Sequence, residues 1–203
     1  MSGFLAAVVI GLSIAAPVGP IGLLVIQRTL QRGTVVGLAT GLGAAVADAL
    51  YGAVGAYGVT TLIRVLQAAR VPLALGGGAF LLWLAWRTWH TPPPDRAAPV
   101  GGSARGLLGC FAGTFVLTLS NPATIFSFIA IFGTLGARTA SATPAWMVLG
   151  VLIGSALWWL LLSAAVGSLR QRFDATWQRR VNRASALLLA AFALWQWAGL
   201  LGA

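Results

Sequence analysis

The sequence predicts an all-α membrane protein of six transmembrane helices, arranged as two inverted three-helix repeats. Three observations predict this fold: the apolar composition, the division of the chain into six apolar runs, and a similarity between its two halves. Of the 203 residues, 59% are hydrophobic and only 8% are charged, whereas an ordinary soluble domain carries roughly a quarter charged residues. A soluble fold of this size must cover its surface with charge, so we expect most of this surface to face lipid.

Charged and polar breaks divide the chain into runs long enough to cross a bilayer, which takes about 20 mostly apolar residues. The runs cover residues 3–27, 34–60, 71–89, 106–133, 144–169 and 184–202. Between the third and fourth runs, three consecutive prolines cannot continue a helix, and glycines follow them. We therefore predict a first repeat over 1–90, a Pro/Gly-rich cytoplasmic linker over 91–105 and a second repeat over 106–203.

The arginines predict the orientation, because arginines near helix ends are retained on the cytoplasmic side of a membrane. The loops after the first, third and fifth runs hold Arg28, Arg32, Arg87, Arg96, Arg105, Arg170, Arg172, Arg179, Arg180 and Arg183. The opposite side holds only Arg64, Arg70 and Arg138. This excess places both termini on the non-cytoplasmic side. The net charge of +10 is then a topology signal with anionic lipid headgroups as partners, and we expect no binding of nucleic acid.

The two halves of the chain resemble each other in the same order. The matching segments are residues 43–51 with 150–158, 78–83 with 190–195, and 15–20 with 120–122. The first match aligns Asp48 with Ser155. Each unit holds three spans, so the second unit must enter the membrane from the opposite side, which makes the repeat inverted. Inverted repeats recur in transporters, with the substrate site at the repeat interface. Chance similarity in a sequence rich in Gly, Ala and Leu is the alternative.

Prolines interrupt the first and fourth runs at corresponding places. Pro17 and Pro20 flank Gly19 in the first run, and Asn121 precedes Pro122 in the fourth. Each proline lacks an N–H and frees the carbonyl four residues earlier, which lipid cannot satisfy, so broken helices occur only against protein or a watery cavity. Two such interruptions predict a binding site between the halves. Simple packing kinks are the alternative.

Asp48 is the one acid that falls well inside a predicted span. A charge at that depth costs about 2.5–3.5 kcal/mol on insertion scales, so it normally faces the interior and has a function. It is a candidate proton carrier or a partner for a substrate ammonium group, and an interhelical hydrogen bond is the alternative. Ser155 occupies the equivalent position of the second repeat. Tyr51, one turn after Asp48, is a candidate ligand contact or a core residue.

Other chemistry lacks the residues it needs. The single cysteine, Cys110, lies in an apolar run and is expected to be a small buried side chain. With one His, one Cys and three Asp, the chain offers no nucleophile–base pair and no set of metal ligands. We therefore expect no enzyme activity, no cofactor and no bound metal.

These motifs resemble those of the LysE/RhtB family of amino-acid exporters. The resemblance rests on Ala16-Pro17-Val18-Gly19-Pro20, the Gly-rich segment 37–43, Asp48 and Asn121-Pro122, and size and span count agree over essentially the whole chain. The resemblance implies proton-driven efflux of amino acids or related metabolites across a bacterial inner membrane. Two departures are Ile21, where many members carry a polar residue after the Pro-x-Gly-Pro motif, and Thr124, where a Lys often stands.

We therefore expect a secondary active exporter that works by alternating access, with a small-molecule substrate such as an amino acid. The expected translocation residues are Pro17, Gly19, Pro20, Asp48, Tyr51, Asn121, Pro122 and Ser155. Export of an inorganic or metal ion and a non-transporting membrane scaffold are the alternatives, and a homodimer is left open. A transporter should have a cavity that reaches Asp48 and Asn121, whereas a scaffold should have kinks without a polar lining.

Overall fold

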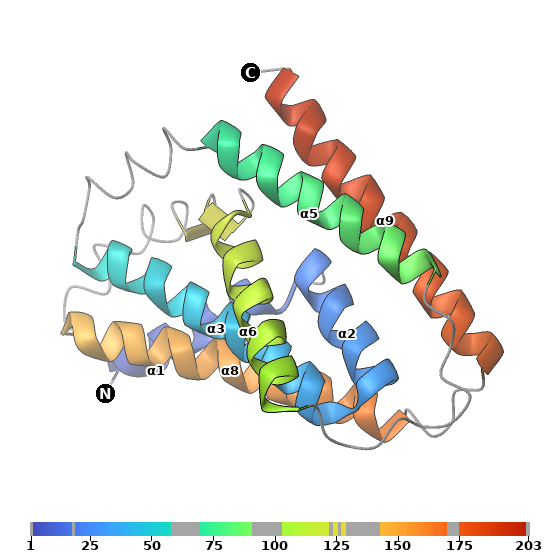
Figure 1. Cartoon of the computed structure of the whole chain (residues 1–203). Coiled ribbons are helices and arrows are strands. Elements are labelled where there is room, and N and C mark those ends of the chain that lie inside the picture. Colours follow the sequence, from blue (N-terminus) through green and yellow to red (C-terminus); the bar gives the residue numbers. More distant parts are fainter. Residues whose placement is uncertain are drawn as a thin grey trace.

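The computed structural model describes residues 2–17, 19–57, 70–90, 103–121, 124–125, 127–128, 143–169 and 175–201. Within these residues the chain forms seven α-helices and no strand, so the prediction of an all-α fold is confirmed (Figure 1). The helices are α1 (Ser2–Ala15), α2 (Pro20–Arg32), α3 (Thr34–Ala56), α5 (Arg70–His90), α6 (Ala104–Leu119), α8 (Pro144–Leu169) and α9 (Ala175–Leu201). Most of the predicted linker, residues 91–102, lies outside the described residues.

Three of the described helices are long and apolar enough to cross a membrane by themselves: α3, α8 and residues 179–200 of α9. The bent pair α1 and α2 passes the same test as one span. Many large apolar side chains are exposed, among them Leu161, Leu187 and Trp195. Exposed apolar surface of this extent marks a membrane or protein contact, and it agrees with a protein embedded in lipid.

The first predicted run, 3–27, is two helices rather than one. α1 and α2 meet at 78°, because Pro17 and Pro20 cannot donate the hydrogen bonds that would continue α1. Pro20 is the first residue of α2, where a missing N–H costs nothing. α2 also extends past the predicted end to Arg32. It ends at Gly33, whose φ of 100° is the left-handed conformation that glycine adopts readily.

The fourth and sixth predicted runs also differ from the structure. α6 ends at Leu119 instead of residue 133, because Asn121 and Pro122 interrupt it, and residues 129–133 lie outside the described residues. α9 begins at Ala175, nine residues before the predicted start, so three arginines expected in a loop lie in its first turns. Arginine is a good helix former, and its long stem lets the charge reach the interface while the helix continues.

The helices pack in a pattern that relates the two halves of the chain. α8 packs against α1 and α3, and α6 packs against α3 (Figure 1). α5 and α9 lie side by side, and α2 contacts α3, α8 and α9. In the predicted repeat, α1 corresponds to α6 and α3 corresponds to α8. The contact between α1 and α8 then corresponds to the contact between α6 and α3. Each of these two helix pairs therefore joins one helix from each half of the chain.

Glycines bring these helices close together. A Cβ on Gly43 of α3 would overlap the carbonyl oxygen of Phe111 in α6. A Cβ on Gly150 of α8 would meet Ala7 and lie 3.0 Å from the carbonyl oxygen of Phe4 in α1. Small residues allow such close backbone contact, which stabilises helix pairs in lipid through van der Waals packing.

Candidate functional site

The break between α1 and α2 opens one side of a cavity. Ala16 N–H still donates to the carbonyl of Leu12 (2.9 Å), and Gly19 carbonyl accepts from Leu23 N–H (3.1 Å). Gly19 precedes α2 in an extended conformation and makes no side-chain cap. The first N–H groups of a helix have no acceptor within the helix. The N–H groups of Ile21 and Gly22 are therefore available at this end of α2.

A cavity of about 290 Å³ lies where the broken segments meet. Its size is near the lower end of pockets that hold small ligands, roughly 300–1,000 Å³. Both halves of the chain contribute to it, from the α1–α2 break, α3, the end of α6, α8 and α9. The polar and break residues in its lining are Pro17, Gly19, Pro20, Asp48, Thr118, Asn121, Thr124 and Ser127. Trp159 and Phe192 are aromatic residues in the same lining.

Asp48 is held in this cavity by a chain of hydrogen bonds from α8. Ser155 Oγ donates to Asp48 Oδ2 at 2.7 Å, and Trp159 Nε1 donates to Ser155 Oγ at 3.1 Å. Asp48 and Trp159 are each 3% exposed and Ser155 is fully buried. Hydrogen bonds to a charged acceptor are shorter and stronger than neutral ones. The serine and the indole therefore fix the carboxyl of Asp48 against α8 while it still borders the cavity.

The end of α6 forms the opposite side of the cavity. Asn121 carbonyl accepts from the N–H groups of Thr124 (3.1 Å) and Ile125 (3.2 Å), so a new helical turn follows the break. Tyr51 OH donates to the carbonyl of Leu119 at 2.7 Å, and its ring stacks on Phe128 with centroids 5.3 Å apart. Tyr51 therefore positions the end of α6 and does not line the cavity.

Two helix ends of opposite polarity meet at this cavity. The N-terminal end of α2 carries a partial positive charge and the C-terminal end of α6 a partial negative charge. Asp48 lies on the same cavity and adds an acidic group. An anionic group is favoured near the start of α2, and a cationic group near Asp48 and the end of α6. This arrangement can bind a small solute that carries both charges.

The structure brings Pro17, Gly19, Pro20, Asp48 and Asn121 around one cavity. Of the other residues expected at the site, Ser155 donates a hydrogen bond to Asp48 and Tyr51 donates one to the carbonyl of Leu119. Pro122 lies outside the described residues. The sequence analysis missed Trp159, which follows Ser155 by one helical turn on the same face, so helical spacing could have indicated it. It also missed the hydroxyl groups of Thr124 and Ser127 and the ring of Phe192.

The fold and the site define a class of protein: a helical membrane protein in which broken helices from both halves line a cavity that contains one buried acid. This is the architecture of transport proteins, because broken backbone at membrane depth is tolerated where it lines a cavity. The chain belongs to the LysE type translocator family, whose family model matches residues 12–195. The resemblance inferred from the motifs is confirmed.

Three relatives show the range of proteins to which the chain is similar. It is 32% identical to "Uncharacterized membrane protein YahN" of Escherichia coli (strain K12), over 84% of this chain and 78% of that protein. It is 30% identical to "Putative amino acid efflux protein YcgF" of Bacillus subtilis (strain 168), over 84% and 83%. It is 27% identical to "Chemotactic transduction protein ChpE" of Pseudomonas aeruginosa, over 94% and 95%. No solved structure matches the chain.

Proposed function

We propose that the protein is a secondary active exporter of amino acids or related small metabolites, driven by the proton gradient through alternating access. One observation carries the proposal: the broken helices of both halves enclose a cavity that holds Asp48. Membership of a translocator family supports transport. The names of two relatives, "Putative amino acid efflux protein YcgF" and "Putative amino-acid transporter YisU", support an amino acid as the substrate.

Two inverted three-helix repeats are part of this proposal, and contacts between equivalent residues support them. Asp48 and Ser155 are 107 positions apart and hydrogen-bond to each other. A residue near a two-fold axis meets its own counterpart in this way. Gly43 lies against Phe111, and Gly150 lies against Phe4. The two glycines are separated by the same number of positions as Asp48 and Ser155, and so are the two phenylalanines. These paired contacts are expected if a two-fold axis in the membrane plane relates the halves.

In the proposed mechanism, the cavity binds a zwitterion between the two helix ends. The substrate carboxylate accepts hydrogen bonds from the N–H groups of Ile21 and Gly22 at the start of α2. The ammonium group lies near Asp48 and the carbonyl groups at the end of α6. The apolar rings of Trp159 and Phe192 border the same space, and they contact the side chain of the substrate.

Asp48 is the coupling residue in this mechanism. As an anion it holds the substrate ammonium, and when it takes up a proton from the acidic side it releases that group. A ligand can shift the conformational equilibrium only by the difference in its affinity for the two states. The proton and the substrate ammonium therefore compete for the same carboxyl, and the competition links the proton gradient to export. Ser155 keeps the carboxyl in place in both forms.

The proposed location is the bacterial inner membrane, with both termini on the non-cytoplasmic side. This orientation follows from the excess of arginines in the loops after the first, third and fifth predicted spans. Arg28, Arg32 and Arg87, at the ends of α2 and α5, and Arg105 at the start of α6, would then lie toward the cytoplasm.

Export from cells tests the proposal. Cells that overproduce the protein are loaded with radiolabelled amino acids one at a time, and the label that appears outside is measured. We expect faster release of at least one amino acid than from cells that contain the Asp48→Asn variant. The Arg179→Gln variant is the control, since Arg179 is exposed on α9 away from the cavity, and it should export like the wild type. Equal release by the wild type and Asp48→Asn would contradict the proposal.

The name of ChpE supports one competing function, an accessory role in signalling. A signalling subunit need not move a solute. If no amino acid is exported faster than from cells that lack the protein, while deletion changes a chemotactic response, the signalling role replaces export.

A further inference from the structure

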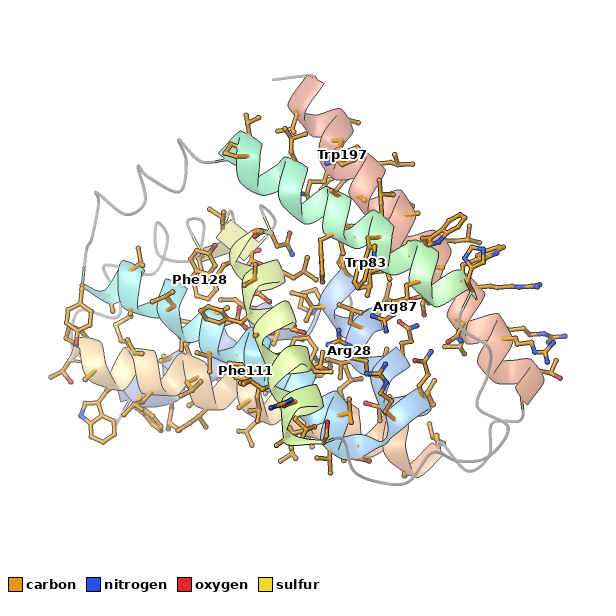
Figure 2. All side chains as sticks on the ribbon, in the orientation of Figure 1. Arg28, Trp83, Arg87, Phe111, Phe128 and Trp197 are labelled. Carbon is orange, nitrogen blue, oxygen red and sulfur yellow. The ribbon has the colours of Figure 1, made fainter. Side chains whose placement is uncertain are left out.

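A second cavity, of about 390 Å³, lies at the other end of α2, between α2, α5 and α6. Its lining holds three arginines, two side-chain amides and a hydroxyl: Arg28, Arg32, Arg87, Gln27, Gln31 and Thr88. Figure 2 labels Arg28 on α2, and Trp83 and Arg87 on α5; all three line this cavity. The guanidinium of Arg87 lies over the ring of Trp83, 5.4 Å from its centroid. The proposed function uses none of these side chains.

Arg28 is fixed in position by neutral oxygen atoms. Its Nη1 donates to Thr40 Oγ1 (3.1 Å), Cys110 carbonyl (3.3 Å) and Thr114 Oγ1 (3.3 Å). Thr40 and Thr114 are at most 1% exposed, so the partners are rigid. All three bonds involve Nη1. Within the described part of the chain, Nε and Nη2 of this guanidinium have no protein acceptor and remain available to a ligand.

The described lining of this cavity holds basic side chains and no acid. Arg28 and Arg32 both line it, and none of the described lining residues is Asp or Glu. Asp48 is the only acid among the residues that the structure describes, and it borders the other cavity. Positive groups that line one cavity raise the local concentration of anions. A guanidinium binds a carboxylate or a phosphate through two parallel hydrogen bonds.

We propose that this second cavity binds a compact oxyanion, and that this oxyanion is the carboxylate group of the transported substrate before it reaches Asp48. The identity of the ligand as substrate rests on the proposed function, whereas the oxyanion chemistry rests on the arginines alone. The phosphate of a lipid headgroup is also an oxyanion that arginines bind. The experiment therefore distinguishes a lipid phosphate from the carboxylate of a substrate.

The two cavities lie along the same helices. Pro20 and Arg28 are about 12 Å apart along α2, at roughly 1.5 Å per residue. On α3, Thr40 contacts Arg28, while Ala44 and Asp48 border the first cavity, and residues four apart share a face. The buried side chain of Leu24 belongs to the apolar cluster between the cavities. A substrate would therefore pass from the arginines to Asp48 through a layer that is closed in this conformation.

Ligand-induced thermal stabilisation of the purified protein tests this proposal. The full chain is placed in nanodiscs of phosphatidylcholine, which has no net charge, and the Tm is followed during titration with acetate, acetamide or inorganic phosphate. We expect acetate to raise the Tm and acetamide, which lacks the charge, to leave it unchanged. The Arg32→Gln variant should weaken the apparent affinity for acetate at least about ten-fold, as expected for a lost charge-assisted hydrogen bond.

Matched variants control for net charge and for folding. Arg179→Gln removes the same charge from an exposed position on α9 and should bind acetate within two-fold of the wild type. Arg32→Lys keeps the charge but loses the planar fork, and should recover part of the affinity. Equal stabilisation by acetate and acetamide, or equal weakening by Arg32→Gln and Arg179→Gln, would overturn the proposal.

Three further results would also overturn it by assigning the cavity to another anion. The first is Arg32-dependent stabilisation by phosphate without any by acetate. The second is Arg32-dependent stabilisation that appears only when phosphatidylglycerol is added to the nanodiscs, which would identify a lipid. The third is acetate binding that is absent from the wild type and appears only when Asp95→Asn and Asp174→Asn are combined. This result would mean that a carboxylate of the chain itself occupies the cavity.

Failure of this proposal can be told apart from failure of the proposed function. If acetate binds in an Arg32-dependent manner but no amino acid is exported, the oxyanion site stands and the exporter proposal fails. If export depends on Asp48 but acetate does not bind, the exporter stands and the second site fails.

Discussion

Removing the hydroxyl of Ser155 should destabilise the protein strongly for the loss of a single atom. In Ser155→Ala, Asp48 Oδ2 loses a donor at 2.7 Å and Trp159 Nε1 loses its acceptor at 3.1 Å. All three side chains are buried; because Asp48 also borders the cavity, water can replace part of the bond lost at its carboxyl but not the acceptor lost by Trp159. A hydrogen bond to a charged group contributes about 1.5–3 kcal/mol, and an unsatisfied buried donor costs about 1–3 kcal/mol. These two contributions add to about 2.5–6 kcal/mol, and partial replacement by water at Asp48 reduces the expected fall in the free energy of unfolding to about 2–5 kcal/mol.

Ser163 provides the matched control on the same helix. Ser163, like Ser155, is fully buried on α8, but its Oγ has no hydrogen-bond partner among the described residues. Ser163→Ala removes an unsatisfied hydroxyl, so stability should be unchanged or rise by about 1 kcal/mol. The assay is unfolding of the purified protein in mixed micelles of increasing SDS content, followed by circular dichroism. Equal effects of the two substitutions would refute the reasoning that the Asp48–Ser155–Trp159 chain stabilises the site.

Three more substitutions test the packing around the cavity. Trp159→Phe keeps the apolar ring but loses the N–H to Ser155, so the same unfolding assay should show a loss of about 1 kcal/mol, smaller than for Ser155→Ala; an equal or larger loss would point to packing instead. Tyr51→Phe keeps the stacking on Phe128 but loses the bond to the Leu119 carbonyl. It should cost about 0.5–1.5 kcal/mol and slow the initial rate of export, and an unchanged rate would argue against a positioning role. Gly154→Ala places a methyl group against the carbonyl of Val8 and should destabilise the α1–α8 contact by about 1–3 kcal/mol. Gly76→Ala, with open space at its Cβ, should be neutral or slightly stabilising. Equal effects of the two substitutions would show that close contact at Gly154 does not stabilise this helix pair.

The sequence predicted those features of the fold that follow from local chemistry. The break at Pro17 and Pro20 follows from the missing N–H groups, and the predicted bounds of α8 agree with the structure. The alignment of the halves paired Asp48 with Ser155, and these two side chains hydrogen-bond to each other. Such a contact is informative because it joins residues that are far apart in the chain.

Other features depend on tertiary packing and could not be predicted. The alignment placed Trp158 opposite Tyr51, but the side chain that reaches Ser155 is its neighbour, Trp159. Only the rotation of α8 against α3 decides between the two. The hydrophobic pattern places Arg28 and Arg32 in a loop, because it predicts where an apolar span ends and not where the helix itself ends. α2 extends through both arginines, which places them in the lining of the second cavity.

The most direct test of proton coupling through Asp48 is a transport measurement in proteoliposomes. The purified protein is reconstituted with a pH-sensitive dye inside the vesicles, and an outward gradient of the amino acid identified by the export assay is imposed. For the wild type we predict proton movement into the vesicles, opposite to the movement of substrate. For Asp48→Asn we predict that no proton movement accompanies whatever substrate exchange remains. Proton movement at the wild-type ratio to substrate in Asp48→Asn would contradict the role of Asp48.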